Sequence, residues 1–431
     1  MAPDITRRIL AARGLRAFGD GYVSLLLPLY LLELGFGAFE VGVIATATLL
    51  GSGLLTLLVG LRAYRYHYRS VLLAATVAMV GTGIAFASFT QFWPLLLIAF
   101  VGTLNPSSGD VSVFLPLEHA VLSRSVSDRD RTAVFARYSL AGTLLAALGS
   151  LAAVLPALVA PWLGGSMKAA LQLMFLLYAA LGLLAALVYR GLPAALETGM
   201  TQPSAPLGKS KKTVYVLASL FSLDAFGGGF VVQSLIALWL YQRFGLSLAT
   251  AANVFFWTGV LTAVSYLVAV RIARRIGLVN TMVFTHIPSS LCLIAIPFMP
   301  ELSYVIALLF VRSALSQMDV PTRSSYVMAI VAPEERPAAA SVTAVPRSLS
   351  ASAGPVLAGY LLSVSSFGWP LVAAGAIKIV YDLLLLATFR RVRPPEEQPQ
   401  EKSQQQPRQL PQRASDGGLL AGGHARSNPE R

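Results

Sequence analysis

Charged side chains that fall inside long apolar stretches are the residues of this sequence best placed to do chemistry. If those stretches cross a bilayer, a charge at the centre costs roughly 2.5–3.5 kcal/mol, so it should face a protein interior and mark a path for ions or solutes. The near balance of their signs predicts that most are paired. The basic members are Arg137, Arg312, Arg323, Arg347 and Lys378, and the acidic members are Asp20, Asp110, Glu118, Asp224, Asp319 and Asp382.

Three of these residues share one stretch. On a continuous helix Arg312, Asp319 and Arg323 would lie on one face, with Asp319 and Arg323 one turn apart and able to pair. We favour a structural role for that pair. Arg312 would lie further along without a local partner, so either an acid on another helix or an anionic group of a substrate would satisfy its guanidinium.

A second candidate is a polar segment in the middle of an apolar stretch, Asn105-Pro106-Ser107-Ser108-Gly109-Asp110. A proline and a glycine there free backbone carbonyls and let the helix break, and transporters use such breaks as binding sites. The alternative is a packing kink in which the serine hydroxyls satisfy the carbonyls. We favour a functional role for Asn105 and Asp110, because the acid follows the break directly.

Matching depth along the stretches predicts two ion pairs between helices. Asp20 and Arg137 lie at similar shallow depths, whereas Asp224 and Arg347 lie deeper, about 16 Å inside at 1.5 Å per residue. Both pairs could be purely structural. A transporter nonetheless needs interactions that differ between its states, so all four residues are candidates for the solute or ion pathway.

Two other pairs are interpreted as local. Lys378 and Asp382 are four residues apart and should pair along one helix. Glu118 and His119 lie near the end of their stretch and should form a solvated surface pair.

No motif indicates a cofactor, a metal or an enzyme. Cys292 is the single cysteine, and His67, His119, His286 and His424 lack the spacing of metal ligands. The sequence contains no P-loop, dinucleotide-binding or nucleophile-elbow motif. We therefore expect no cofactor, no metal site and no catalytic residue.

The elements that must position the charged residues are apolar stretches of membrane-spanning length. Of the 431 residues 55% are hydrophobic and 12% are charged, and the mean hydropathy is +0.67, so lipid must be the solvent for much of the chain. A spanning helix needs about 20 apolar residues. Twelve are predicted, at residues 15–35, 39–61, 70–90, 93–123, 131–160, 167–189, 213–241, 249–273, 278–298, 301–331, 336–364 and 369–390.

Basic residues alternate between the connections of these helices. The N-terminus, the even-numbered connections and the segment after the last helix carry arginines and lysines, whereas the odd-numbered connections hold only Lys168 and Arg243. By the positive-inside rule this predicts an even number of spans with both termini in the cytoplasm, in the plasma (inner) membrane. The net charge of +13 therefore indicates membrane orientation rather than a nucleic-acid partner.

The chain divides into two similar halves. Arg131 and Arg336 open equivalent helices, and Asp110 and Asp319 each precede a valine in another equivalent pair. Duplicated halves joined by a charged linker predict two pseudo-symmetric six-helix bundles around a central cavity. We place an N-terminal bundle at residues 1–189, a cytosolic linker at 190–212, a C-terminal bundle at 213–392 and a disordered cytosolic tail at 393–431.

With this layout the sequence resembles the major facilitator superfamily (MFS) over residues 15–390. The first helix, from Gly21 to Tyr30, and the eleventh, with Gly354, Pro355 and Gly359, are similar to helices of that family. The resemblance implies an all-α polytopic membrane protein with the twelve-helix MFS fold.

The best-known family motif, a Gly-x-x-x-Asp-Arg-x-Gly-Arg-Arg loop between the second and third helices, is degenerate here. Gly60, Arg65 and Arg69 match it, but Tyr64 replaces the acid and His67 the second glycine. This departure weakens any inference about the family's usual gating charges. The fifth helix has Gly149-Ser150 where proton-coupled drug antiporters of the family have Gly-Pro, so drug antiport is not indicated.

The resemblance implies a monomeric secondary transporter that moves a small organic or anionic solute across the bilayer, in uptake or efflux, by rocking of its halves. Asp20, Asp110 and Asp224 could take up a proton when buried, which would couple transport to H⁺. The alternative is a transport-inactive receptor or scaffold with the same fold. A scaffold has no need for a broken helix that carries Asp110, and an intramembrane enzyme would need a catalytic constellation that the sequence lacks.

Overall fold

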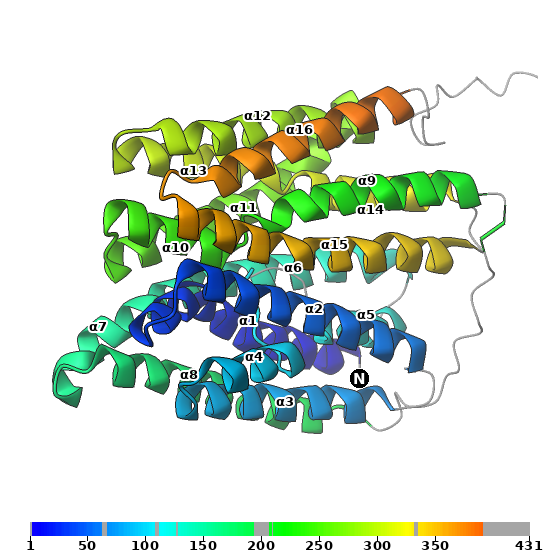
Figure 1. Cartoon of the computed structure of the whole chain (residues 1–431). Helices are drawn as coiled ribbons and strands as arrows, with labels where there is room; N and C mark the ends of the chain where they lie inside the picture. Colours follow the sequence, from blue (N-terminus) through cyan, green and yellow to red (C-terminus); the bar gives the residue numbers. More distant parts are fainter. Residues whose placement is uncertain are drawn as a thin grey trace, which may run out of the picture.

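The architecture is that of two helical bundles that lie side by side, α1–α8 and α9–α16 (Figure 1). The computed structural model describes residues 2–62, 67–107, 112–125, 128–193, 207–208, 210–331 and 335–390. Within this part every regular element is a helix. Most of the predicted linker and the whole predicted tail at 393–431 lie outside the described residues.

The first bundle contains eight α-helices, with 3₁₀ turns on both sides of α7. They are α1 (Ala2–Glu33), α2 (Ala38–Arg62), α3 (Tyr68–Ser88), α4 (Phe92–Val101), α5 (Phe114–Ser125), α6 (Asp128–Leu151), α7 (Leu155–Val159) and α8 (Met167–Arg190).

The second bundle repeats this order with its own interruptions. Its helices are α9 (Lys211–Gly229), α10 (Gln233–Phe244), α11 (Leu248–Ile276), α12 (Leu278–Ala295), α13 (Leu302–Ser316), α14 (Asp319–Ile330), α15 (Arg336–Val364) and α16 (Trp369–Phe389).

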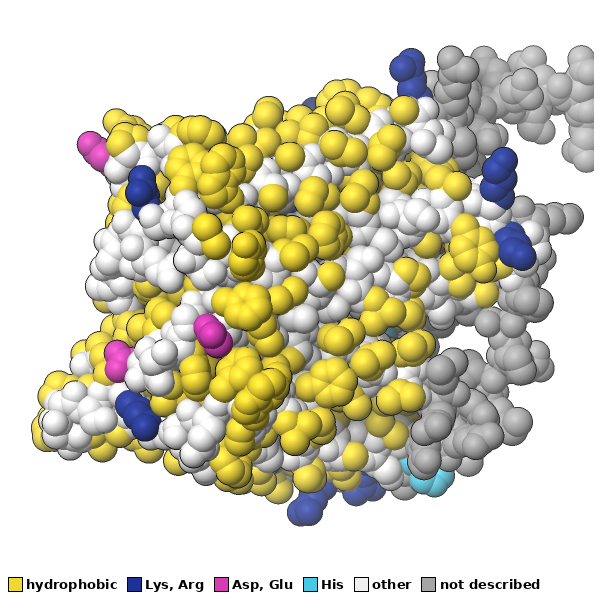
Figure 2. All heavy atoms as spheres, in the orientation of Figure 1, with side chains coloured by type: hydrophobic (Ala, Val, Ile, Leu, Met, Phe, Trp, Pro, Cys, Tyr) yellow, Lys and Arg dark blue, Asp and Glu magenta, His cyan; other side chains and the backbone are white. Residues whose placement is uncertain are grey.

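The described helices give twelve crossings, which confirms the predicted fold class. Ten helical runs are long and apolar enough to span a membrane. The broken pair α4–α5 makes an eleventh and the 29-residue α15 a twelfth. α1 begins and α16 ends at the same end of the molecule, here called the terminal end (Figure 1). Hydrophobic side chains cover the middle of the visible face, and charged ones lie near its two ends (Figure 2).

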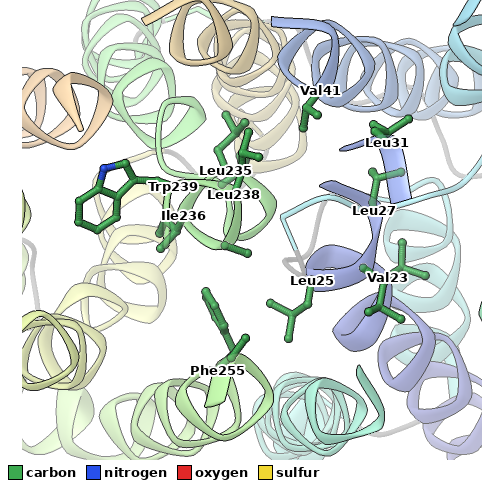
Figure 3. Close-up of a cluster of buried hydrophobic side chains, with 14 of the residues drawn as sticks. Val23, Leu25, Leu27, Leu31, Val41, Leu235, Ile236, Leu238, Trp239 and Phe255 are labelled. Carbon is green, nitrogen blue, oxygen red and sulfur yellow. The ribbon is translucent and has the colours of Figure 1, made fainter. Parts of the chain in front are cut away.

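Three hydrophobic cores hold the bundles together. The joint core combines both bundles away from the terminal end, where side chains of α1 and α2 face those of α10 and α11. Figure 3 shows Leu25 of α1 pointing toward Phe255 of α11. The first-half core, from Ile5 to Leu192, and the second-half core, from Val214 to Phe389, each draw on one bundle only and lie toward the terminal end.

Close contact between α2 and α15 depends on glycine. A Cβ at Gly42 would lie 2.5 Å from the Pro355 carbonyl oxygen, and one at Gly359 would lie 2.6 Å from that of Ala38. Beside them the Val356 amide, which follows the proline kink, donates a 2.9 Å hydrogen bond to the Thr46 hydroxyl. The bundles therefore meet through backbone contact between small residues, as membrane helices commonly do.

Candidate functional site: buried ion pairs beside broken helices

The predicted break in the fourth span is present. α4 ends at Val101, and the chain stays non-helical through Ser107 before α5 begins at Phe114. The buried Asn105 holds the break, because its Oδ1 accepts hydrogen bonds from the Ser107 amide at 3.1 Å and from the Ser107 hydroxyl at 2.7 Å. Ser108, Gly109 and Asp110 lie outside the described residues.

The second half has breaks that the sequence analysis did not predict. The tenth span is interrupted at Gln317 and Met318, and the seventh between Gly229 and Gln233. The Ser234 amide donates a 3.0 Å hydrogen bond to the Pro106 carbonyl, so the broken segments of the two halves touch. Because the tenth span is not continuous, the same-face argument that linked Arg312 to Asp319 was wrong.

Asp224 of α9 is the centre of a buried network in the second half. Its two carboxylate oxygens pair with Lys378 Nζ of α16 at 2.7 Å and with Arg323 of α14 at 3.1 Å. Arg323 also reaches Asp319, one turn earlier, at 3.3 Å, which confirms that predicted pair. Separating these helices would leave buried charges without a partner, which is energetically costly. The network should therefore hold α9, α14 and α16 together.

His286 of α12 extends the network to a third carboxylate. Its Nδ1 lies 3.0 Å from Asp382 of α16, and its Nε2 lies 3.8 Å from Asp224. His286 is 3% exposed and Asp382 is fully buried. The predicted local pair between Lys378 and Asp382 was therefore wrong, because each side chain has a closer partner on another helix.

Two of the arginines predicted inside the apolar stretches of the second half, Arg312 and Arg347, lack an ion pair among the described residues. Arg347 of α15 interacts electrostatically with Arg323, Asp224 and Asp319, yet its Nε has no hydrogen-bond partner there. Arg312 of α13 interacts electrostatically with Cys292 of α12, and its Nε is likewise without a partner. The predicted Asp224–Arg347 pair was wrong, because the two carboxylate oxygens of Asp224 pair with Arg323 and Lys378 instead.

The first half has its own buried ion pair. Glu118 of α5, which is fully buried, pairs with Arg16 of α1 and accepts hydrogen bonds from Tyr138 of α6 and Tyr189 of α8, the last at 2.6 Å. The Arg16 guanidinium also stacks 3.9 Å from the Phe114 ring centroid. The prediction that Glu118 is solvated at the surface was wrong, because four helices enclose it.

The remaining candidates differ in exposure. Asp20 is buried in α1, 6% exposed. Arg137 is exposed and shares its side of α6 with the exposed Leu144 and Leu148. The predicted burial of Arg137 was therefore wrong. A long basic side chain near a helix end can reach polar surroundings without a buried partner.

Sequence reasoning missed four members of these networks, among them Tyr138. Arg16 was counted with the basic N-terminus, although fourteen helical residues precede it in α1. His286 was judged only by metal-ligand spacing, and Tyr189 only as part of an apolar stretch. A histidine in the middle of a spanning helix is itself a polar residue in need of a partner, and that signal could have identified it.

Comparisons with known proteins agree with this arrangement. The chain matches the Major Facilitator Superfamily model over residues 9–222 and 217–429. An uncharacterised membrane protein of Saccharomyces cerevisiae is 25% identical over 410 residues, which cover 87% of this chain and 92% of the yeast protein.

Solved structures with the same fold are transporters. A variant of the nucleoside transporter NupG aligns with a TM-score of 0.71 at 13% identity, covering 89% of this chain and all of that one. The human organic anion transporter MFSD10 aligns with a TM-score of 0.62 at 19% identity, covering 88% of this chain and 99% of that one. At such identities the likeness establishes the fold.

Proposed function

Because the chain belongs to the major facilitator superfamily, we propose that this membrane transporter is a secondary transporter that moves a small solute by alternating access. One observation carries the proposal: within the described residues, the two halves share a core away from the terminal end, and toward that end each half has a core of its own. Halves packed in this way can rock about their joint region as rigid units.

The contacts between the halves suit such a motion. Beside the apolar side chains of the joint core, they include close contacts between small residues, such as Gly42 against Gly359 and Gly259 against Ala147. Within each half, in contrast, a buried ion pair ties the first span to the broken fourth span. Strong pairs inside the halves and neutral contacts between them would let the interface rearrange while each half stays intact.

The solute path would run between the halves, past the broken spans. Asn105, Asp20 and Asp110 of the first half and Asp224 of the second remain its candidate residues, with Asp319 and Arg323 beside them. Arg347 and Arg312 would offer guanidinium groups to an anionic part of the solute, since neither has an ion pair among the described residues. Arg137, exposed on α6, would act only at the entrance.

Proton coupling would reside in the second half. His286 lies between two carboxylates, Asp382 and Asp224, and Asp224 also holds Lys378 and Arg323. A proton gained or lost by this network of side chains would change which cations Asp224 binds. The contacts that hold α9, α14 and α16 together would change with it. The basic connections support cytoplasmic termini in the plasma (inner) membrane.

A reversible lock tests alternating access. In a Cys292→Ser background, Thr46→Cys and Val356→Cys place two thiols across the joint region, where the native residues share a hydrogen bond. A thermal-shift screen supplies a solute that stabilises the protein, and its exchange is then measured in proteoliposomes. We expect a short thiol cross-linker to stop exchange and reduction to restore it.

The control cross-links within one half. Phe36→Cys and Phe92→Cys replace two rings whose centroids lie 5.7 Å apart in the first bundle, and this lock should leave exchange intact. A solute that stabilises the protein but never exchanges, even in the reduced state, would instead support the receptor or scaffold alternative.

A further inference from the structure

A basic cavity of about 620 Å³ lies at the terminal end of the second half, outside the networks described above. It is enclosed by the end of α11, the start of α12, α14 and the end of α16. Three of its described lining residues are arginines, Arg274, Arg275 and Arg390, and none of the described lining residues is acidic. Its volume falls within the range of small-molecule sites, roughly 300–1,000 Å³.

The three arginines carry the charge of this cavity. Arg274, Arg275 and Arg390 are exposed, and none forms an ion pair with a described residue. α12 begins at the cavity without a side-chain cap, because Gly277 precedes it at φ +87°.

The walls of the cavity are apolar beside its basic mouth. Val270 and Ile276 of α11 line it and are 48% and 42% exposed, and Phe389 of α16 closes it from the other side. A ligand seated here would place an anionic group on the arginines and an apolar part against these residues. A guanidinium group can bind two oxygens of one phosphate through two parallel hydrogen bonds. Phosphate is therefore the anion that fits this cavity best.

We propose that this cavity binds a phosphate group, and that the headgroup of an anionic phospholipid in the leaflet at the terminal end supplies it. The exposed apolar wall favours a lipid over a soluble phosphate, because acyl chains would cover Val270 and Ile276. The occupant would also contact Pro321 and Thr322 of α14, which lie in sequence between Asp319 and Arg323. Headgroup binding would thus support the helical turn that carries the buried network. The proposal does not depend on transport.

The test compares two triple variants that remove the same charge from the same end. Arg274→Gln with Arg275→Gln and Arg390→Gln empties the cavity of cations. The control, Arg190→Gln with Lys211→Gln and Lys212→Gln, removes three exposed cations outside it. Native mass spectrometry titrates each purified full-length protein with dioleoyl phosphatidic acid, with dioleoyl phosphatidylcholine, and with inorganic phosphate or glycerol 3-phosphate.

Wild type and control should bind phosphatidic acid well above phosphatidylcholine, and the cavity variant should bind it about 100-fold more weakly, at about fivefold for each basic residue. If wild type bound glycerol 3-phosphate as tightly as phosphatidic acid, the ligand would be a soluble phosphate, and the proposal of a lipid headgroup would be overturned. Equal losses in both triple variants, or no loss in either, would overturn the site itself. If the cavity variant does not fold, Arg274→Gln and Arg390→Gln alone should each weaken binding about fivefold.

Discussion

The two halves place a buried ion pair at the same topological position but with opposite polarity. In the first half the cation is on the first span and the anion on the second part of the broken fourth span, Arg16 with Glu118. In the second half the anion is on the first of its spans and the cation on the broken one, Asp224 with Arg323. The shared position indicates that each half needs this tie between a long helix and a short, interrupted one.

The surroundings of the two pairs differ, and this difference suggests a different role for each pair. In the first half Glu118 holds one cation, Arg16, and two tyrosine hydroxyls donate to the same carboxylate. Asp224 instead shares its carboxylate between two cations and lies beside His286, which leads on to Asp382. A pair with a single cation fixes one arrangement, whereas a network with a spare titratable group can adopt more than one. If transport is coupled to protons as proposed, we expect the first pair to contribute stability and the second network to contribute coupling.

The largest effect should come from Glu118→Gln. This change leaves the Arg16 guanidinium buried without its counter-charge, which should destabilise the protein by about 3–5 kcal/mol. Melting temperature and the fraction of monodisperse protein in detergent measure the loss. The double variant with Arg16→Gln should recover part of it, and a double variant no better than the single one would contradict the pairing of Arg16 with Glu118.

The next effect concerns the partners of Asp224. A double-mutant cycle on the free energy of unfolding combines Asp224→Asn with Lys378→Met. It should give a coupling energy of about 0.5–3 kcal/mol, because Lys378 Nζ lies 2.7 Å from an Asp224 carboxylate oxygen. The matched cycle with Arg347→Met should give a smaller coupling, since Arg347 makes no ion pair with that carboxylate. If Arg347 showed a larger coupling energy than Lys378, the pair predicted between Asp224 and Arg347 would be correct after all. The comparison between the Glu118 pair and the Asp224 network would then lose its basis.

A third prediction separates coupling from exchange. His286→Gln keeps a polar side chain that can still hydrogen-bond Asp382, so the fold should persist. We expect proteoliposomes with this variant to exchange solute down its gradient but to lose accumulation driven by a proton gradient. His67→Gln, at the exposed N-cap residue of α3, is the control and should accumulate solute normally. Proton-driven accumulation that survives in His286→Gln would place coupling elsewhere.

The smallest effect on stability should come from Arg312→Lys. The substitution keeps the charge but loses the planar guanidinium, and no ion pair among the described residues depends on that shape. The melting temperature should stay within about 2–4 °C of wild type, the shift that a change of about 1 kcal/mol produces in a larger domain. Solute exchange should nonetheless fall if the guanidinium contacts an anionic solute. A large loss of stability with normal exchange would make Arg312 structural.

The sequence by itself determined the solvent of this protein and the number of its crossings. Apolar stretches of fixed length and a repeated pattern of basic connections depend only on local composition, which is why the twelve spans could be placed from the chain alone. The break at Asn105 and the pair of Asp319 with Arg323 were also local, since proline, glycine and a spacing of four act within one or two helical turns.

The partners of the other buried charges were decided only by the tertiary structure. Depth along a helix places a charge in one dimension, but its partner also depends on which face it occupies and which helices pack against that face. Thus Arg323 and Lys378 reached Asp224 in place of Arg347, and Glu118 lay among four helices rather than in solvent. In a membrane a charge pairs with the nearest opposite group in three dimensions, because lipid offers it no other partner.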